Sequence, residues 1–118
     1  MEESNIKKEE VDWNSKENNQ LLNAFLLLEN KDEIRRFLRD LMSKGEIEEF
    51  SRRLETARLL SRDVQYCEII EKTGLSSTTV ARISKWLRGS LGGYRLVLNK
   101  MHHTHSQNSV GKGLSLHS

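Results

Sequence analysis

Residues 65–88 read QYCEIIEKTGLSSTTVARISKWLR, and this stretch decides the fold. It predicts two short helices joined by a tight turn, the first over about residues 65–72. Gly74 falls at the turn, where glycine adopts a left-handed backbone conformation at little cost. Either Ser76 or Ser77 can begin the second helix, because a serine hydroxyl accepts a hydrogen bond from an early amide.

The apolar residues of this stretch recur at positions that face inward when two helices pack across such a turn. They are Ile69 and Ile70 before the glycine, and Leu75, Val80 and Ile83 after it. This spacing is typical of a helix-turn-helix, a motif whose second helix can enter the major groove of DNA. A purely structural corner between two helices needs similar packing, so the spacing alone leaves both interpretations open.

The outward side of the second helix carries side chains that suit a nucleic-acid surface. Hydroxyl groups can bond phosphates or base edges, threonine and alanine methyl groups can contact a thymine methyl, and an arginine can bind guanine with two hydrogen bonds. The second helix also lacks carboxylates, which phosphates would repel. The predicted DNA-binding residues are Gln65, Tyr66, Lys72, Ser76, Ser77, Thr78, Thr79, Arg82, Lys85 and Arg88, and Arg95 is predicted to grip a further phosphate.

Charge is distributed unevenly along the chain. Residues 1–50 carry 8 basic and 13 acidic side chains, whereas the chain from Lys72 onward carries 7 basic side chains and no acidic one. A half-chain with only positive charge is attracted to a polyanion. Chance clustering on a solvated surface would produce the same counts, so charge supports the nucleic-acid interpretation without establishing it.

Composition limits the other classes. Apolar residues make up 36% of the 118 residues, which is low for one globular domain, so either part of the chain is unfolded or a second copy shares the core. No apolar run reaches the length of a membrane span, and the acidic N-terminus does not fit a secretory signal, so we expect a cytoplasmic protein without membrane contact. The single cysteine, Cys67, excludes an internal disulfide and a cysteine-rich zinc site.

The rest of the chain also predicts helices and no sheet. Apolar spacings of three and four residues predict helices over about residues 16–29, 32–42 and 46–61, and no segment alternates with a period of two. The first of these helices is apolar around much of its circumference and therefore needs burial on more than one side. The fold class is predicted as all-α.

The two ends of the chain differ from its middle. Residues 1–16 are polar and aperiodic, and residues 102–118 are small, polar and glycine-containing, so both are predicted to be disordered arms. The folded domain is predicted over residues 17–101. Its last part, after Gly92 and Gly93, is expected to be a flexible joint into a final helix.

At these residues the sequence resembles the Trp-repressor-like superfamily, and within it the YerC/YecD-type proteins. The resemblance covers about residues 21–101 and is most specific in Phe37–Leu60, Tyr66–Leu87 and Gly92–Leu98. It implies about six helices and an intertwined homodimer in which the N-terminal helices of one subunit pack on the other. It also implies a sequence-specific, repressor-like regulator of transcription that binds double-stranded DNA.

The resemblance raises the question of a small-molecule effector. It implies that Arg52 and Arg82 occupy the positions of the two arginines that flank bound tryptophan in the Trp repressor. Ile83 and Trp86 stand where that repressor has a glycine and a serine, so we expect the pocket to be filled by the protein's own side chains. The prediction is therefore no response to tryptophan, and it leaves open whether another effector binds.

Other functions are less well supported by the sequence. The main alternative is a protein-interaction or scaffold module that keeps the fold without specific DNA binding, with the acidic first half serving a basic partner. We expect no enzyme, because no nucleophile, base and orienting group occur together. We expect no cofactor and no metal site, because His102, His103 and His105 lie in the C-terminal arm without a carboxylate or cysteine partner.

Overall fold

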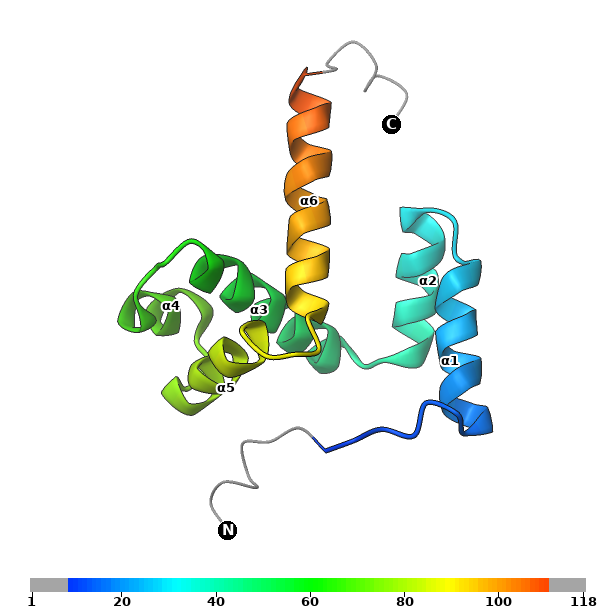
Figure 1. Cartoon of the computed structure of the whole chain (residues 1–118). Coiled ribbons are helices and arrows are strands. Elements are labelled where there is room, and N and C mark those ends of the chain that lie inside the picture. The colour runs from blue at the N-terminus through cyan, green and yellow to red at the C-terminus, as the bar shows by residue number, and fades with distance from the viewer. Residues whose placement is uncertain (1–8, 111–118) are drawn as a thin grey trace. The chain divides into compact units, whose positions relative to one another are not determined.

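The computed structural model describes the backbone of residues 9–110 and the side chains of residues 9–104. Within this range the chain forms six α-helices and no strand, which confirms the predicted fold class (Figure 1). The helices are α1 (Lys16–Leu27), α2 (Lys31–Leu41), α3 (Lys44–Ser61), α4 (Tyr66–Thr73), α5 (Ser77–Leu87) and α6 (Gly93–Val110). None of the described helices is both long and apolar enough to cross a membrane.

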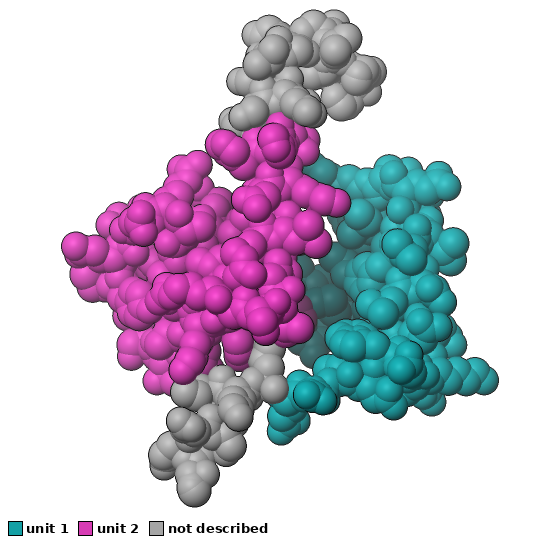
Figure 2. All heavy atoms as spheres, in the orientation of Figure 1, with its two compact units in different colours: residues 1–49 teal, residues 50–118 magenta. Residues whose placement is uncertain are grey.

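The chain divides into two compact units (Figure 2). Unit 1 comprises residues 1–49 and unit 2 comprises residues 50–118. Unit 1 therefore contains α1, α2 and the first residues of α3. Unit 2 contains the rest of α3 together with α4, α5 and α6.

In unit 1, α1 and α2 lie side by side and run in opposite directions (Figure 1). The ring of Phe25 on α1 meets the ring of Phe37 on α2 edge to face, with centroids 5.5 Å apart and an interplanar angle of 82°. This is a favoured geometry for two aromatic rings. Yet no residue of α1 or α2 is buried, and Leu26 and Leu27 are 82% and 76% exposed. One copy of unit 1 thus leaves apolar surface in water.

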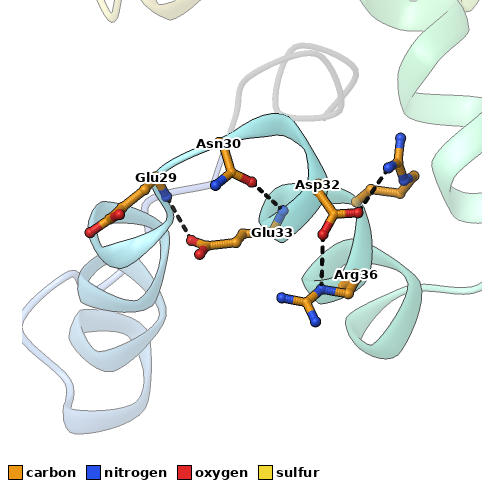
Figure 3. A network of polar contacts seen from close by, with 6 residues as sticks. Glu29, Asn30, Asp32, Glu33 and Arg36 are labelled. Carbon is orange, nitrogen blue, oxygen red and sulfur yellow. Dashed lines mark hydrogen bonds and ion pairs between the residues drawn. The ribbon is translucent and has the colours of Figure 1, made fainter.

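A capping box begins α2 (Figure 3). The side chain of Asn30 accepts a hydrogen bond from the amide of Glu33 at 2.9 Å, and the carboxylate of Glu33 accepts one from the amide of Glu29 at 2.9 Å. Asp32 in the first turn pairs with Arg36 at 3.4 Å. Reciprocal bonds of this kind satisfy amides that have no partner inside the helix.

Unit 2 holds the hydrophobic core. The buried apolar residues that cluster there are Ala57 and Leu59 of α3, Ile69 of α4, Leu75 of the turn, and Val80 and Ile83 of α5. Trp86, Tyr94 and Leu98 are partly buried and pack against them. Four of the five inward positions predicted from the sequence are buried, and Ile70 is partly buried beside them.

The structure extends the last helix beyond its predicted end. α6 follows Gly92, which has a positive φ of 73°, and continues to Val110, whereas the sequence predicted a disordered arm from residue 102. The physical reason is that neither proline nor a further glycine occurs between Gly93 and Gly111, so nothing interrupts the helix despite its polar composition. Residues 111–118 of that predicted arm, and residues 1–8 of the N-terminal one, lie outside the described residues.

We predict that Gly74→Ala lowers the free energy of unfolding by about 1–2 kcal/mol, because Gly74 has a φ of 77° that an L side chain rarely adopts. No atom lies within 4 Å of the added Cβ, so the cost comes from the backbone alone. Gly93→Ala is the matched control, since its Cβ also meets nothing within 4 Å and its φ is not positive. Urea denaturation followed by circular dichroism measures both, and equal stabilities of the two variants would contradict the prediction.

Candidate nucleic-acid interface

The turn between α4 and α5 is fixed by hydrogen bonds on both sides of Gly74. The amide of Gly74 donates to the carbonyl of Ile70 at 2.9 Å. The hydroxyl of Thr73, which is buried, donates to the carbonyl of Ile69 at 2.8 Å and accepts from the amide of Leu75 at 3.3 Å. Gly74 itself is left-handed, as the sequence predicted. The turn therefore holds the two helices at one fixed angle.

Ser76 is the N-cap of α5. Of the two serines that the sequence left open, it is therefore Ser76 that caps the helix. Its hydroxyl accepts a hydrogen bond from the amide of Thr79 at 3.1 Å and lies 3.0 Å from the Thr79 hydroxyl, to which it donates. Thr79 is half-buried, whereas Ser77 and Thr78 are exposed. The hydroxyls of Ser76 and Thr79 thus serve the start of the helix, whereas Ser77 and Thr78 lie exposed beside them.

The two sides of α5 face different surroundings. Val80, Ile83, Ser84 and Leu87 are buried on one side. On the other side Ser77, Thr78, Ala81 and Lys85 are exposed, and Arg82 is half-buried with its Nε enclosed and without a hydrogen-bond partner among the described residues. This second side is referred to below as the outer face of α5. It carries no carboxylate.

Both ends of α4 and the C-terminal end of α5 add further predicted residues to the same motif. Gln65 and Tyr66 are exposed at its start. Lys72 is also exposed and pairs with Glu68 one turn earlier, with Nζ 3.1 Å from Oε2. An exposed pair of this kind contributes little to stability, so Lys72 can exchange this partner for a phosphate. Arg88, the C-cap of α5, is exposed as well.

Arg95 does not lie as the sequence predicted. Its Nη1 donates to the carbonyl oxygens of Leu87 at 2.6 Å and of Gly89 at 2.8 Å, so the guanidinium closes the C-terminal end of α5. The sequence assigned it to a phosphate because the position of α6 beside that helix end could not be read from composition. The missed signal was the short loop of glycines and serines that returns the chain to α5.

The two residues expected to fill an effector pocket, Ile83 and Trp86, both lie against the core. Ile83 has no exposed surface, and Trp86 packs against the core cluster. Of the two arginines implied as its flanks, Arg52 is exposed on α3 and Arg82 is half-buried on α5. Ile83 is thus part of the hydrophobic core.

An open groove in unit 2 is separate from the outer face of α5. It has a volume of about 1180 Å³ and lies among the C-terminal ends of α3 and α5 and residues 95–104 of α6. Apolar side chains contribute to it, including Leu60, Leu87 and Leu98. Its charged lining residues are Arg58, Arg62, Asp63, Arg88, Arg95 and Lys100. The groove therefore combines apolar side chains with charged side chains that are mostly basic.

Glu55 neutralises one arginine of this groove. Arg58 donates two hydrogen bonds to the Glu55 carboxylate, at 2.9 and 2.8 Å. These bonds lower the pKa of Glu55; burial opposes them, and the charges of Arg58, Lys72 and Arg62 lower the pKa further. Within α6, burial instead raises the pKa of Tyr94, which anchors the start of the helix to the core.

Comparison with known proteins finds a matching family model and a related protein. The family model of the Trp repressor protein matches residues 16–102. The uncharacterized protein YerC of Bacillus subtilis is 34% identical over 94 residues, which cover 80% of this chain and 90% of YerC.

Two solved structures share this fold. A TrpR-like protein from Eubacterium eligens superposes with a TM-score of 0.72 at 32% identity, covering 76% of this chain and 93% of that one. A candidate Trp repressor from Staphylococcus aureus superposes with a TM-score of 0.67 at 31% identity, covering 71% and 84%. The resemblance drawn from the sequence is confirmed.

We predict that Ser76→Ala lowers the free energy of unfolding by about 1 kcal/mol, because the amide of Thr79 loses the hydroxyl that caps α5. Ser77→Ala, one residue inside the helix, is expected to have no destabilising effect, since alanine is the better helix former there. Thermal unfolding by circular dichroism compares the two. A larger loss for Ser77→Ala than for Ser76→Ala would show that the cap has been misassigned.

Proposed function

Because the chain belongs to the Trp repressor protein family, we propose that it is a sequence-specific DNA-binding regulator of transcription that acts as a homodimer. The observation that carries this proposal is the outer face of α5. Ser77, Thr78 and Lys85 are exposed on it, while Val80 and Ile83 are locked in the core behind it. A protein with this role acts beside the chromosome, so we expect it in the cytoplasm.

In the proposed mechanism α5 enters the major groove, which is wide enough to admit one helix. Ser77, Thr78 and Arg82 read base edges from the outer face. The phosphate contacts come from Lys72, Lys85 and Arg88. Contacts to bases specify the sequence, whereas contacts to phosphates hold the protein in register and supply most of the salt-dependent affinity.

The proposed homodimer joins two surfaces that each copy leaves open. Unit 1 exposes apolar side chains on α1 and α2, and residues 1–50 carry a net charge of −5. The groove of unit 2 is apolar and predominantly basic. Unit 1 of one copy therefore complements the groove of another in both hydrophobicity and charge. A twofold dimer would set two α5 helices about 34–36 Å apart, one turn of DNA.

The proposal includes DNA binding without tryptophan as an effector. Ile83 has no exposed surface and Trp86 packs against the core, so an indole ring would have to displace the protein's own side chains. Displacing well-packed core side chains costs several kcal/mol. We therefore expect the free protein to be competent to bind DNA.

The first test is selection from a random library of duplexes of about 30 base pairs, long enough for two half-sites one turn apart. The purified protein is used with and without tryptophan, and we expect one enriched palindromic site in both cases. Thr78→Ala is expected to weaken binding to that site about ten-fold and to leave binding to a scrambled duplex unchanged. Lys85→Gln is the matched variant, which should weaken both and reduce the salt slope by about one.

Two outcomes would contradict this function. Enrichment of no site would favour the protein-interaction module that the sequence left open. Enrichment only in the presence of tryptophan would contradict the expectation that the protein's own side chains fill the tryptophan pocket.

The second test concerns the homodimer. Leu26→Ser is expected to weaken dimerisation by a factor of at least about 100, because a symmetric interface contains the change twice and each leucine contributes about 1.5–3 kcal/mol when covered. Leu91→Ser is the control, since Leu91 is 78% exposed and Leu26 is 82% exposed in one copy, but Leu91 lies on the loop before α6 and not on unit 1. Sedimentation equilibrium measures the dissociation constants. A monomeric wild type would overturn the dimer, and equal constants for both variants would overturn the interface on unit 1.

A further inference from the structure

The C-terminal end of α5 is closed by a side chain from the next helix. A helix end leaves carbonyl groups without amide partners, and side chains or water must satisfy them. At this end the amides of Arg88 and Gly89 take the carbonyls of Ser84 and Trp86. Arg95 of α6 takes those of Leu87 and Gly89, at 2.6 and 2.8 Å. A positive charge at this end of a helix is also favoured by the helix dipole.

Gly92 provides the space that this contact needs. A Cβ at Gly92 would lie 3.1 Å from Nη2 of Arg95, closer than most such contacts. Gly92 also has a φ of 73°, which returns the chain from the end of α5 into α6. The two residues thus form one arrangement, in which the turn at Gly92 brings Arg95 back to the carbonyls of Leu87 and Gly89.

The remaining contacts of α5 do not fix its direction equally well. Val80, Ile83 and Leu87 are buried by apolar contacts, which have little directional preference. The hydrogen bonds of Ser76 fix only the N-terminal end. A charge-assisted pair of hydrogen bonds is directional, so Arg95 fixes the opposite end.

From this geometry we infer that Arg95 is a positioning residue, which sets the direction of α5 and thereby the presentation of Ser77 and Thr78 to DNA. The inference rests on the proposed function. It replaces the phosphate contact that the sequence assigned to Arg95, because Nη1 of Arg95 donates to two carbonyls and so ties the guanidinium to the end of α5. Arg95 acts through α5 and touches no base.

The two roles differ in what the protein loses. A lost phosphate contact weakens binding to every sequence about equally and reduces the salt slope by about one. A misdirected α5 loses contacts to bases, so affinity for the selected site falls while affinity for a scrambled duplex and the salt slope remain. The ratio of the two affinities therefore separates positioning from phosphate binding.

The experiment compares wild type, Arg95→Gln and Arg95→Lys on the duplex enriched by wild type and on a scrambled duplex of the same length. Measurements are made well below the unfolding transition, where circular dichroism shows full helicity, so that lost stability does not appear as lost affinity. Sedimentation under the same conditions checks the dimer, because Arg95 also lines the groove of unit 2. Lys85→Gln serves as the phosphate-contact reference.

We expect Arg95→Gln to lose about ten-fold in affinity for the enriched site, with an unchanged salt slope and unchanged binding to the scrambled duplex. Arg95→Lys keeps a cation that can reach a carbonyl and is expected to recover part of this loss, and it carries the test alone if the glutamine variant does not fold. Equal losses on both duplexes with a reduced slope, or no loss at all, would overturn the inference. If wild type itself selects no site, the proposed function fails together with this inference. If wild type selects a site and the Arg95 variants discriminate as well as wild type, only the role of Arg95 fails.

Discussion

The packing of α4 against α5 across Gly74 is the constraint on which the rest of the structure depends. Ile69, Val80 and Ile83 have no exposed surface, and this burial is possible only if the chain reverses within the few residues between the two helices. The left-handed conformation of Gly74 makes that reversal. Once one side of α5 is committed to the core, the helical period leaves the opposite side in water. The outer face of α5 is thus a geometric consequence of the buried one.

Folding also decides which polar groups remain for a ligand. The hydroxyls of Thr73, Ser76 and Thr79 all take part in hydrogen bonds that hold the turn or begin α5. A group that is already bonded offers less to a partner, because a new contact must first replace the old one. Ser77 and Thr78 are exposed beyond these bonds. The candidate interface is therefore narrower than a list of every hydroxyl in the motif.

Local rules explain how much could be predicted from the sequence. The spacing of Ile69, Val80 and Ile83 and the position of Gly74 depend on neighbours within a few residues, so the helix-turn-helix and its core could be predicted. The role of Arg95 could not, because its bonds to Leu87 and Gly89 require the relative placement of two helices. α6 continues to Val110, past the predicted end of the domain at residue 101, because neither proline nor glycine occurs between Gly93 and Val110. Polar composition alone therefore does not exclude a helix.

Unit 1 shows that the contacts within one copy of the chain do not explain the stability of α1 and α2. Its helices are well begun, with caps at Ser15 and Asn30, yet they contain no buried residue. Capping contributes about 1 kcal/mol per helix, whereas an isolated helix of eleven or twelve residues is marginal in water without tertiary packing. The contact between Phe25 and Phe37 adds only part of what is missing. The proposed homodimer supplies the remainder by covering α1 and α2, and in doing so it would also fix the distance between two α5 helices. The same burial that stabilises unit 1 would then set the spacing at which the protein reads DNA.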